Sequence, residues 1–235
     1  MAAGRVIELF SSIQGEGRYA GRPHVFVRLA GCNLSCSYCD TPESRSTASG
    51  ASITPNALLD KIASELRSWH HAVAITGGEP LCQSDFVAEL LRLNLIKGIA
   101  AKPFLLETNA SLPSELENVI AYIDIVSADI KLPSVSGTPP LWDEQREFIK
   151  IASLKEAYVK VPVSAKTDVI EFTRAAKLVA DINPGLPFYI QPVEPCAKIN
   201  QRVDSYTLVK LLKIAGERLS DISVMPQIHK YLGIK

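Results

Sequence analysis

Short runs of β-branched and aromatic residues alternate with segments of helical period along this chain, and this alternation is what most constrains its fold. Strands are expected at 24–31, 71–76, 103–108, 123–132, 157–164 and 187–193. Helices are expected from Thr54 onward and at 85–95, 113–122, 143–155, 168–182 and 203–218. Strands separated by helical segments of this length form βαβ units around a parallel sheet, so the chain is expected to be an α/β protein.

Six such units are fewer than a closed eight-fold barrel needs. The expected fold is therefore a partial (β/α)6-type barrel with parallel strands, and a doubly wound sheet is the alternative. The most linker-like stretch, Pro42 to Ser52, is small and polar but too short to separate two domains. We therefore expect residues 1–235 to form a single domain.

In both architectures, ligands bind at the carboxyl ends of the strands. Polar residues follow the predicted strands at those ends: Cys32, Thr76 to Glu79, Glu107 to Asn109, Ser127 to Lys131, and Gln191 to Glu194. Their recurrence predicts one shared site on one face of the molecule.

Charge and hydropathy exclude several classes of partner. Lys plus Arg and Asp plus Glu both number 25, so the formal net charge is zero and gives no footprint for nucleic acid or an anionic membrane. We find no apolar run long enough to span a bilayer and no secretory signal at the N-terminus. These features predict a cytoplasmic protein, whose thiols stay reduced and serve a metal or redox site more readily than disulfides.

Three of the five cysteines, Cys32, Cys36 and Cys39, lie in the segment GCNLSCSYCDT with Cys-x-x-x-Cys-x-x-Cys spacing. Cys82 and Cys196 have no thiol neighbour in the sequence and are expected to be small buried hydrophobes. A structural zinc site normally needs four ligands, and one of the four histidines could complete it, but the chain has no second cysteine knuckle. Iron–sulfur clusters take thiolate ligands, and three thiolates leave one iron of a four-iron cluster open.

The triplet, with Tyr38 before its last cysteine, resembles the radical S-adenosylmethionine superfamily. This resemblance implies a radical SAM core with a [4Fe–4S] cluster on Cys32, Cys36 and Cys39. It also implies that the open iron binds S-adenosylmethionine, which yields a deoxyadenosyl radical on reduction. The cofactors carry the hard chemistry, so no catalytic side chain is expected.

The segment TGGEP, Thr76 to Pro80, resembles the GGE motif of that superfamily, although Gly-Gly also marks ordinary turns. By similarity, Gly78 lies against the cofactor, Glu79 takes its ammonium, and Ser127, Asp129 and Gln191 reach its ribose and carboxylate. The full set of cofactor-binding residues that the resemblance implies is Tyr38, Cys39, Asp40, Gly78, Glu79, Ser127, Asp129, Gln191, Pro192, Val193 and Glu194. The register of the loop 127–131, and with it the role of Lys131, stays open at this point.

Three further features narrow the resemblance. Gln14-Gly15-Glu16-Gly17 precedes the cysteine loop, Thr41 follows Cys39-Asp40, and the chain ends in QIHKYLGIK. From Ile7 to Lys235 the chain resembles the 7-carboxy-7-deazaguanine synthase family, which has a shortened barrel.

That resemblance implies a carbon–nitrogen lyase that converts 6-carboxytetrahydropterin to 7-carboxy-7-deazaguanine by ring contraction with loss of ammonia. S-adenosylmethionine is regenerated and Mg²⁺ assists. The product enters 7-deazapurine pathways such as queuosine-type or archaeosine-type tRNA modification. The resemblance further implies a homodimer, and the chemistry requires a reducing partner such as flavodoxin or ferredoxin.

By similarity, the substrate-binding residues are Ile13, Gln14, Gly15, Glu16, Arg28, Thr76, His229 and Lys235, and Thr41 is a ligand of Mg²⁺. Gln14 and Glu16 suit the donors and acceptors of a pterin edge, and Arg28 offers the fork that binds a carboxylate. Thr41 supplies a hard oxygen of the kind Mg²⁺ prefers. Singly, each could be a turn, ion-pair or capping residue, but their joint order favours one site.

The chain departs from the family pattern where the usual ETNG becomes Glu107-Thr108-Asn109-Ala110, which raises a question about the local turn. The terminal Lys235 also departs from it, although a main-chain carboxylate does not depend on its side chain.

Two other functions compete with the synthase. A glycyl-radical activase shares the cysteine triplet but needs an open groove for a peptide, and a non-catalytic zinc module predicts a colourless protein.

Overall fold

The computed structural model describes residues 3–195, 199 and 201–234, and within these residues nine strands form one sheet in the order β3-β1-β2-β4-β5-β6-β7-β8-β9. The strands are β1 (Gly4–Ile13), β2 (Pro23–Leu29), β3 (Ala51–Ile53), β4 (Ala72–Gly77), β5 (Phe104–Thr108), β6 (Ile125–Asp129), β7 (Glu156–Val163), β8 (Phe188–Pro192) and β9 (Ile222–Val224). The helices are α1 (Pro55–Glu65), α2 (Ser84–Lys97), α3 (Pro113–Val119), α4 (Pro133–Ser136), α5 (Trp142–Ala152), α6 (Val169–Ile182), α7 (Ser205–Gly216) and α8 (Ile228–Leu232). Short 3₁₀ turns lie at η1 (Gly17–Tyr19), η2 (Pro42–Arg45), η3 (Thr47–Ser49), η4 (Pro80–Gln83) and η5 (Ile120–Tyr122).

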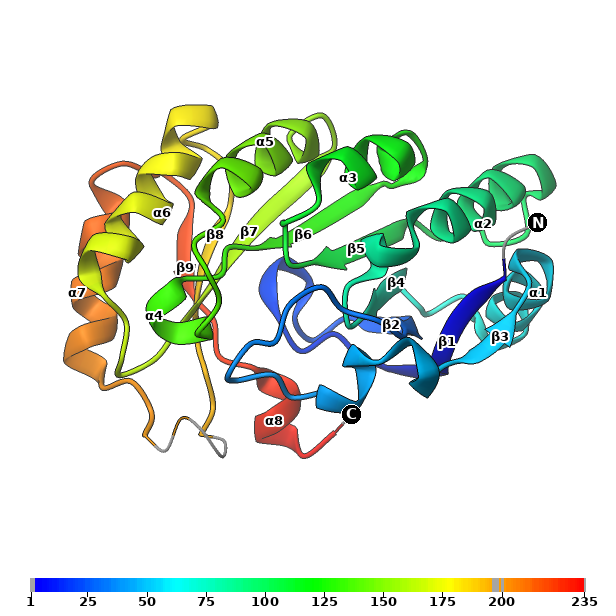
Figure 1. The fold of residues 1–235 in the computed structure, drawn as a ribbon, viewed down its shortest axis with the longest axis horizontal. Coiled ribbons are helices and arrows are strands. Elements are labelled where there is room, and N and C mark those ends of the chain that lie inside the picture. The colour runs from blue at the N-terminus through cyan, green and yellow to red at the C-terminus, as the bar shows by residue number, and fades with distance from the viewer. Residues whose placement is uncertain (1–2, 196–198, 200, 235) are drawn as a thin grey trace.

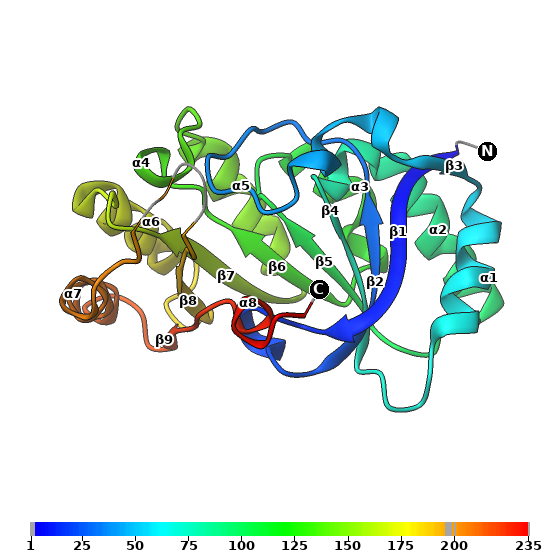
Figure 2. The same cartoon turned by 90° about the horizontal axis from the view of Figure 1, so that it is seen from below.

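The parallel strands β2 and β4 to β9 follow one another across the sheet in chain order. A doubly wound sheet reverses its order at a switch point, and no such reversal occurs among these strands. The helices α1, α2, α3, α5, α6 and α7 all lie on one side of the sheet (Figure 1), whereas α8 lies on the other side (Figure 2). The prediction of a partial (β/α) barrel is therefore confirmed, and the doubly wound alternative is wrong.

The six predicted strands correspond to β2 and β4 to β8, and the predicted start of α1 is confirmed because the Thr54 side chain accepts a hydrogen bond from the Ala57 N–H at 3.3 Å. Sequence reasoning missed β1, β3 and β9. β1 pairs antiparallel with β2, and β3 pairs antiparallel with β1 at the edge of the sheet. β3 and β9 have three residues each, too few to show a period. The stretch 42–52 is not a linker, because it contains η2, η3 and the start of β3.

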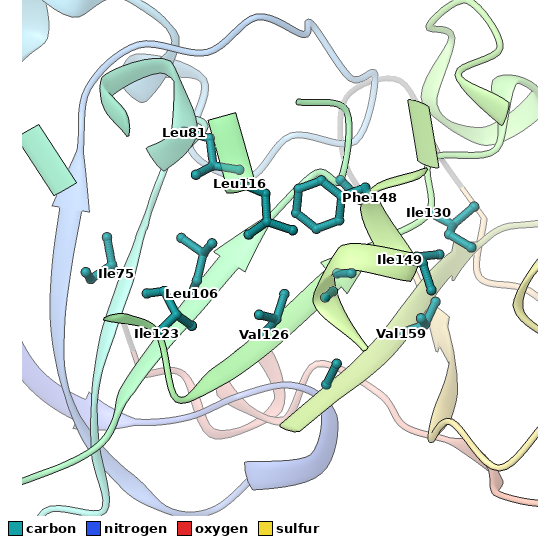
Figure 3. Close-up of a cluster of buried hydrophobic side chains, with 14 of the residues drawn as sticks. Ile75, Leu81, Leu106, Leu116, Ile123, Val126, Ile130, Phe148, Ile149 and Val159 are labelled. Atoms are coloured by element: carbon teal, nitrogen blue, oxygen red, sulfur yellow. The ribbon is translucent and has the colours of Figure 1, made fainter. Parts of the chain in front are cut away.

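The main hydrophobic core lies between the sheet and its layer of helices (Figure 3). Strand residues Ile75, Leu106 and Val126 are completely buried there, as are Leu116 of α3 and Phe148 of α5. Burial of each such side chain is worth about 2 kcal/mol, so this layer holds the strands in register.

The inner face of the sheet changes character along each strand. Its first part is apolar, with Phe26, Ala74, Leu105, Ile125 and Tyr158 buried in a second, smaller cluster. Two residues further along the same strands stand Arg28, Thr76, Glu107, Ser127 and Lys160. Because side chains two residues apart share a face, an apolar base is followed by a polar layer toward the carboxyl ends.

His24 lies at the start of β2, at the opposite end of that strand from the cysteine loop. Its ring is fully buried and stacks on His71 at 5.5 Å, between Phe26 and Tyr19. Neither ring nitrogen has a hydrogen-bond partner among the described residues. Burial, with the nearby His71 and His70, lowers the pKa of His24 from 6.5 to about 4, so the ring is neutral at pH 7.

This burial predicts an acid-sensitive fold. Because the folded pKa of His24 lies below its unfolded value, the unfolded chain binds more protons between pH 6.5 and about 4. Stability falls as the pH drops through that window, by about 3 kcal/mol for a shift of this size. Urea unfolding at several pH values should show a shallower loss for His24→Leu than for the unsubstituted protein, and equal slopes would contradict the prediction.

Candidate active site

A cavity of about 390 Å³ opens at the carboxyl ends of the parallel strands. Residues from all three predicted sets line it. The substrate set contributes Ile13, Gln14, Gly15, Glu16, Arg28, Thr76 and His229, the cofactor set Tyr38, Cys39, Asp40, Gly78, Asp129, Gln191 and Val193, and the metal set Cys32, Cys36, Cys39 and Thr41. Segments from both ends of the chain thus meet in one pocket, as the sequence predicted.

Several predicted residues do not line this pocket. Ser127 is fully buried on β6, Pro192 ends β8, and the Glu194 carboxylate pairs with Arg202 at 2.7 Å. Lys235 lies outside the described residues, as does Cys196. Cys82, expected to be a buried hydrophobe, is exposed because η4 turns it outward beside the buried Leu81.

Glu79 is fully buried behind the pocket wall, and its contact with the cofactor's ammonium stays a prediction. Its carboxylate accepts hydrogen bonds from the N–H groups of Asn109 at 2.7 Å and Leu81 at 3.1 Å, and from the Thr108 hydroxyl at 2.9 Å. Burial raises the pKa of Glu79 to about 7 against the effect of these donors. Its side chain therefore ties the loop after β4 to the loop after β5.

The loop carrying the three cysteines is held by main-chain contacts. The Arg45 side chain donates to the Cys36 carbonyl at 2.6 Å, and Ser37 N donates to Ser136 O at 2.7 Å. Burial raises the pKa of Cys32 and of Cys36, so both are thiols until a metal binds and deprotonates them.

Among the described residues, no three His, Cys, Asp or Glu side chains are grouped so that they could hold one metal ion. A four-iron cluster attaches each thiolate to a different iron and does not require the sulfurs to converge. The donor set and its position on one pocket wall therefore fit an iron–sulfur cluster.

Gly78 shows how closely the end of β4 packs against the cysteine loop. Its N–H donates to Leu29 O at 3.1 Å, and a side chain here would clash with Gly31 O and meet Ser44 O at 2.7 Å. Only glycine leaves the pocket wall open at this point.

Across the pocket, Gln191 Oε1 is buried and has no hydrogen-bond partner among the described residues. Such an acceptor requires a donor, and a ribose hydroxyl would supply one. The residues present therefore fit a nucleoside-bearing cofactor.

Buried charges form the polar layer of the pocket. Lys160 Nζ lies 2.5 Å from Glu16 Oε2 and 3.2 Å from Asp129 Oδ1, and Lys131 Nζ lies 2.7 Å from Asp129 Oδ2. Burial alone would raise the pKa of Glu16 and of Asp129. The Lys160 ammonium and the Gln227 hydrogen bond outweigh it at Glu16, and Lys131 and Lys160 together outweigh it at Asp129, so both pKa values lie below the ordinary range. Both carboxylates are therefore ionised acceptors.

Gln14 and Arg28 are fixed by neighbouring acids. The Gln14 side-chain amide donates to Glu107 at 2.7 Å and accepts from the Glu16 N–H at 3.1 Å. Arg28 contacts Glu8 through Nε at 2.7 Å, so a ligand carboxylate would meet the terminal nitrogens of its fork. Arg28 therefore lines the pocket, as predicted. It also forms an ion pair with Glu8, which was the alternative role considered from the sequence.

The short helix α8 lies on the side of the sheet opposite the layer of long helices (Figure 2). Ile228 N donates to Gly15 O at 3.0 Å, and the Gln227 amide donates to Glu16 at 2.6 Å. Lys230 lies 3.2 Å from Asp40 Oδ2, and His229 lies 3.8 Å from the same oxygen. These contacts place α8 between the first loop and the cysteine loop.

Asp40 is anionic in this setting. Burial alone would raise the pKa of Asp40, but the His229 hydrogen bond and the Lys230 charge outweigh it and hold the pKa well below its usual range. The Lys230–Asp40 ion pair is therefore present across the neutral range.

Glu107 lines the pocket, as expected of the polar residues at the strand ends, whereas sequence reasoning missed Lys160 and Gln227 as pocket residues. Strand alternation could have found Lys160, because it stands two residues after the inward-facing Tyr158. Nothing local marks Gln227, whose place depends on how α8 folds back.

The Gly15→Ala substitution tests the packing of α8 against the Gln14–Gly17 loop. A Cβ here would clash with His229 Nδ1, so we expect α8 to shift and affinity for the pocket's ligand to fall about tenfold, which corresponds to a modest overpacking cost. Ligand titration and limited proteolysis near α8 measure this. Gly185→Ala, where a Cβ meets its nearest atom at 3.4 Å, is the matched control. Equal affinity in both variants would contradict the prediction.

The chain resembles known proteins in sequence and fold. Residues 27–135 match the family model described as the Radical SAM superfamily. A 7-carboxy-7-deazaguanine synthase of Geobacter sulfurreducens is 34% identical, covering 96% of this chain and 96% of that protein. A 7-carboxy-7-deazaguanine synthase of Methanothermobacter thermautotrophicus is 36% identical, covering 98% of this chain and 97% of that protein.

Among solved structures, QueE from Escherichia coli matches with a TM-score of 0.64 at 20% identity, covering 95% of this chain and 94% of that one. At that identity the match speaks for the fold alone. Of the described helices, none is long and apolar enough to cross a membrane.

Proposed function

The chain belongs to the 7-carboxy-7-deazaguanine synthase family of radical SAM proteins, and on this premise we propose that its pocket converts 6-carboxytetrahydropterin to 7-carboxy-7-deazaguanine with loss of ammonia. The observation that carries the proposal is the convergence of three groups of residues on one cavity. The cysteine loop, the Gln14–Gly17 loop with Arg28, and His229 of α8 all line it. One cavity can then hold both the cofactor and the substrate.

The radical SAM family implies a [4Fe–4S] cluster and S-adenosylmethionine. When bound and reduced, these groups supply the radical that removes one hydrogen from the substrate. Cys32, Cys36 and Cys39 would hold the iron, Gly78 would let the cofactor approach the backbone, and Gln191 would accept from its ribose. The remaining cofactor residues on the pocket wall, Tyr38, Asp40, Asp129 and Val193, would position it.

The substrate would lie between Glu16 and Arg28. Gln14 and Glu16 would bind the pyrimidine edge of the pterin, since a carboxylate accepts from two adjacent N–H donors. Arg28 would bind the substrate carboxylate, with Thr76 beside it as its partner in the register of β2 and β4. His229 would cover the substrate from α8, while the role of the Lys235 carboxylate stays a prediction.

We also propose Mg²⁺ beside Thr41. This residue lines the pocket next to Asp40 and Glu43, and its Oγ1 lies 3.2 Å from Ser44 Oγ. Mg²⁺ keeps most of its waters and needs few protein ligands, so one hydroxyl with nearby acids is sufficient.

Several further properties belong to the same proposal. Radical chemistry requires a one-electron donor, for which a flavodoxin or ferredoxin is suitable. We also propose that the protein is a cytoplasmic homodimer and that residues 1–235 form a single domain. The product would serve tRNA modification only through metabolism, because the chain has no net positive charge.

The glycyl-radical activase is not favoured. Its protein substrate would need an open groove, whereas here α8 is joined to both the first loop and the cysteine loop. The resemblance over nearly the whole chain is to the synthases.

An anaerobic assay tests the proposal. Reconstituted and reduced protein, given S-adenosylmethionine, Mg²⁺ and 6-carboxytetrahydropterin, should form 7-carboxy-7-deazaguanine with little net loss of S-adenosylmethionine. Arg28→Ala should lower kcat/KM about a hundredfold, because losing both charge-assisted bonds costs about 3 kcal/mol. Arg67→Ala, a substitution in the α1–β4 loop outside the pocket lining, is the control. Deoxyadenosine without ring contraction would show that the substrate is wrong.

A further inference from the structure

Lys160 of β7 is a buried lysine that the proposed reaction has not yet used. Its side chain is 4% exposed, and it stands opposite Asp129 in the pairing of β6 with β7. The neighbouring positions Val159 and Val161 point into the core, so strand alternation directs Lys160 to the pocket side. Burying an ammonium is costly unless it is paired, so its partners decide what it does.

Those partners are two carboxylates, and they differ in the number of cations that contact them. Asp129 has a second cation, Lys131, at 2.7 Å. In the described part of the chain, Lys160 is the only cation in contact with Glu16, whose other oxygen accepts from the Gln227 amide at 2.6 Å. Removing the Lys160 charge would therefore leave Glu16 as the less compensated acid.

Glu16 must be ionised to accept hydrogen bonds from the pyrimidine edge of a pterin. The 2-amino-4-oxopyrimidine ring of a pterin presents an amino N–H beside a ring N–H, and an ionised carboxylate accepts from both. A protonated carboxyl would place its own O–H against one of these donors. A binding site that mismatches its ligand's hydrogen bonds loses most of its discrimination.

We propose that Lys160 is a positioning and specificity-determining residue for the pterin: its ammonium holds Glu16 ionised and directed at the ring edge. The Asp129 contact holds the ammonium in place from the other side. This inference rests on the proposed function, because it takes a pterin as the ligand of Glu16.

Loss of the ammonium gives a pH signature. The ionisable groups around Glu16 and Lys160 come from β5, β6, the loop after β6, and β7, and they are Glu107, Asp129, Lys131 and Tyr158. Without Lys160, burial and the Asp129 charge both raise the pKa of Glu16, and only hydrogen bonding such as that from Gln227 opposes them. In Lys160→Met, pterin affinity should therefore fall as the pH falls and recover as the pH rises.

The experiment is anaerobic equilibrium dialysis with pterin-6-carboxylate, using the cluster-reconstituted protein with S-adenosylmethionine, from about pH 5.5 to about pH 7.5, where the ring N–H of the probe is still present. We expect Lys160→Met to bind at least about tenfold more weakly than the unsubstituted protein at the acid end and to recover most of the loss at the alkaline end. Lys177→Met, a change to an exposed lysine of α6, should bind normally throughout.

A double-mutant cycle separates positioning from packing. Glu16→Gln should weaken binding at every pH, and adding Lys160→Met to it should cost little more, because the amide that replaces the Glu16 carboxylate has no charge to support. If Lys160→Met does not fold, Lys160→Gln takes its place, since it keeps a donor and removes the charge. Circular dichroism monitors folding.

The outcomes separate the two claims. If the unsubstituted protein fails to bind pterin-6-carboxylate, the proposed function is wrong. If it binds while the Lys160 variant matches it at every pH, or is weakened equally at every pH, the assignment of Lys160 is overturned and the residue is only structural.

Discussion

The two-residue repeat of the β-strand is the constraint on which this pocket depends. On five neighbouring strands the inner face is apolar at one position and polar two residues later, so one alternation builds both the base of the barrel and the layer above it. The alternate residues pack against the helices and hold the register. A one-residue slip of β7 would exchange Lys160 for a valine and place an ammonium in the core.

Charge compensation is the second requirement. Glu16 and Asp129 stay ionised although they are largely buried, because Lys160 lies against both and Lys131 lies against Asp129. Helix α8 contacts this charged group through Gln227, and the Lys230–Asp40 pair joins α8 to the cysteine loop. The loop proposed to bind the ligand therefore also anchors α8, through Gly15 and Glu16.

Much of this could be predicted from the sequence. The βα alternation predicted the partial barrel, and the motif order placed the Gln14–Gly17 loop, Arg28, the cysteines and His229 at one site. What it could not give depends on long-range geometry: the antiparallel β1, the seat of α8, and the main-chain donors that draw Glu79 behind the wall. The ETNA turn is a smaller case, because Ala110 adopts a left-handed φ of 57°, the conformation that glycine usually supplies. Lys160 was accessible from alternation but has no motif to mark it.

The central claim is that one pocket holds the cofactor at the cysteine loop and a pterin between Glu16 and Arg28. A crystal structure of the reconstituted protein with S-adenosylmethionine and pterin-6-carboxylate tests it most directly. The account predicts the ligand carboxylate on the Arg28 fork and the aminopyrimidine edge on Glu16, with Lys160 still bridging Glu16 and Asp129. A pterin bound elsewhere, or one whose ring edge faces away from Glu16, would contradict it.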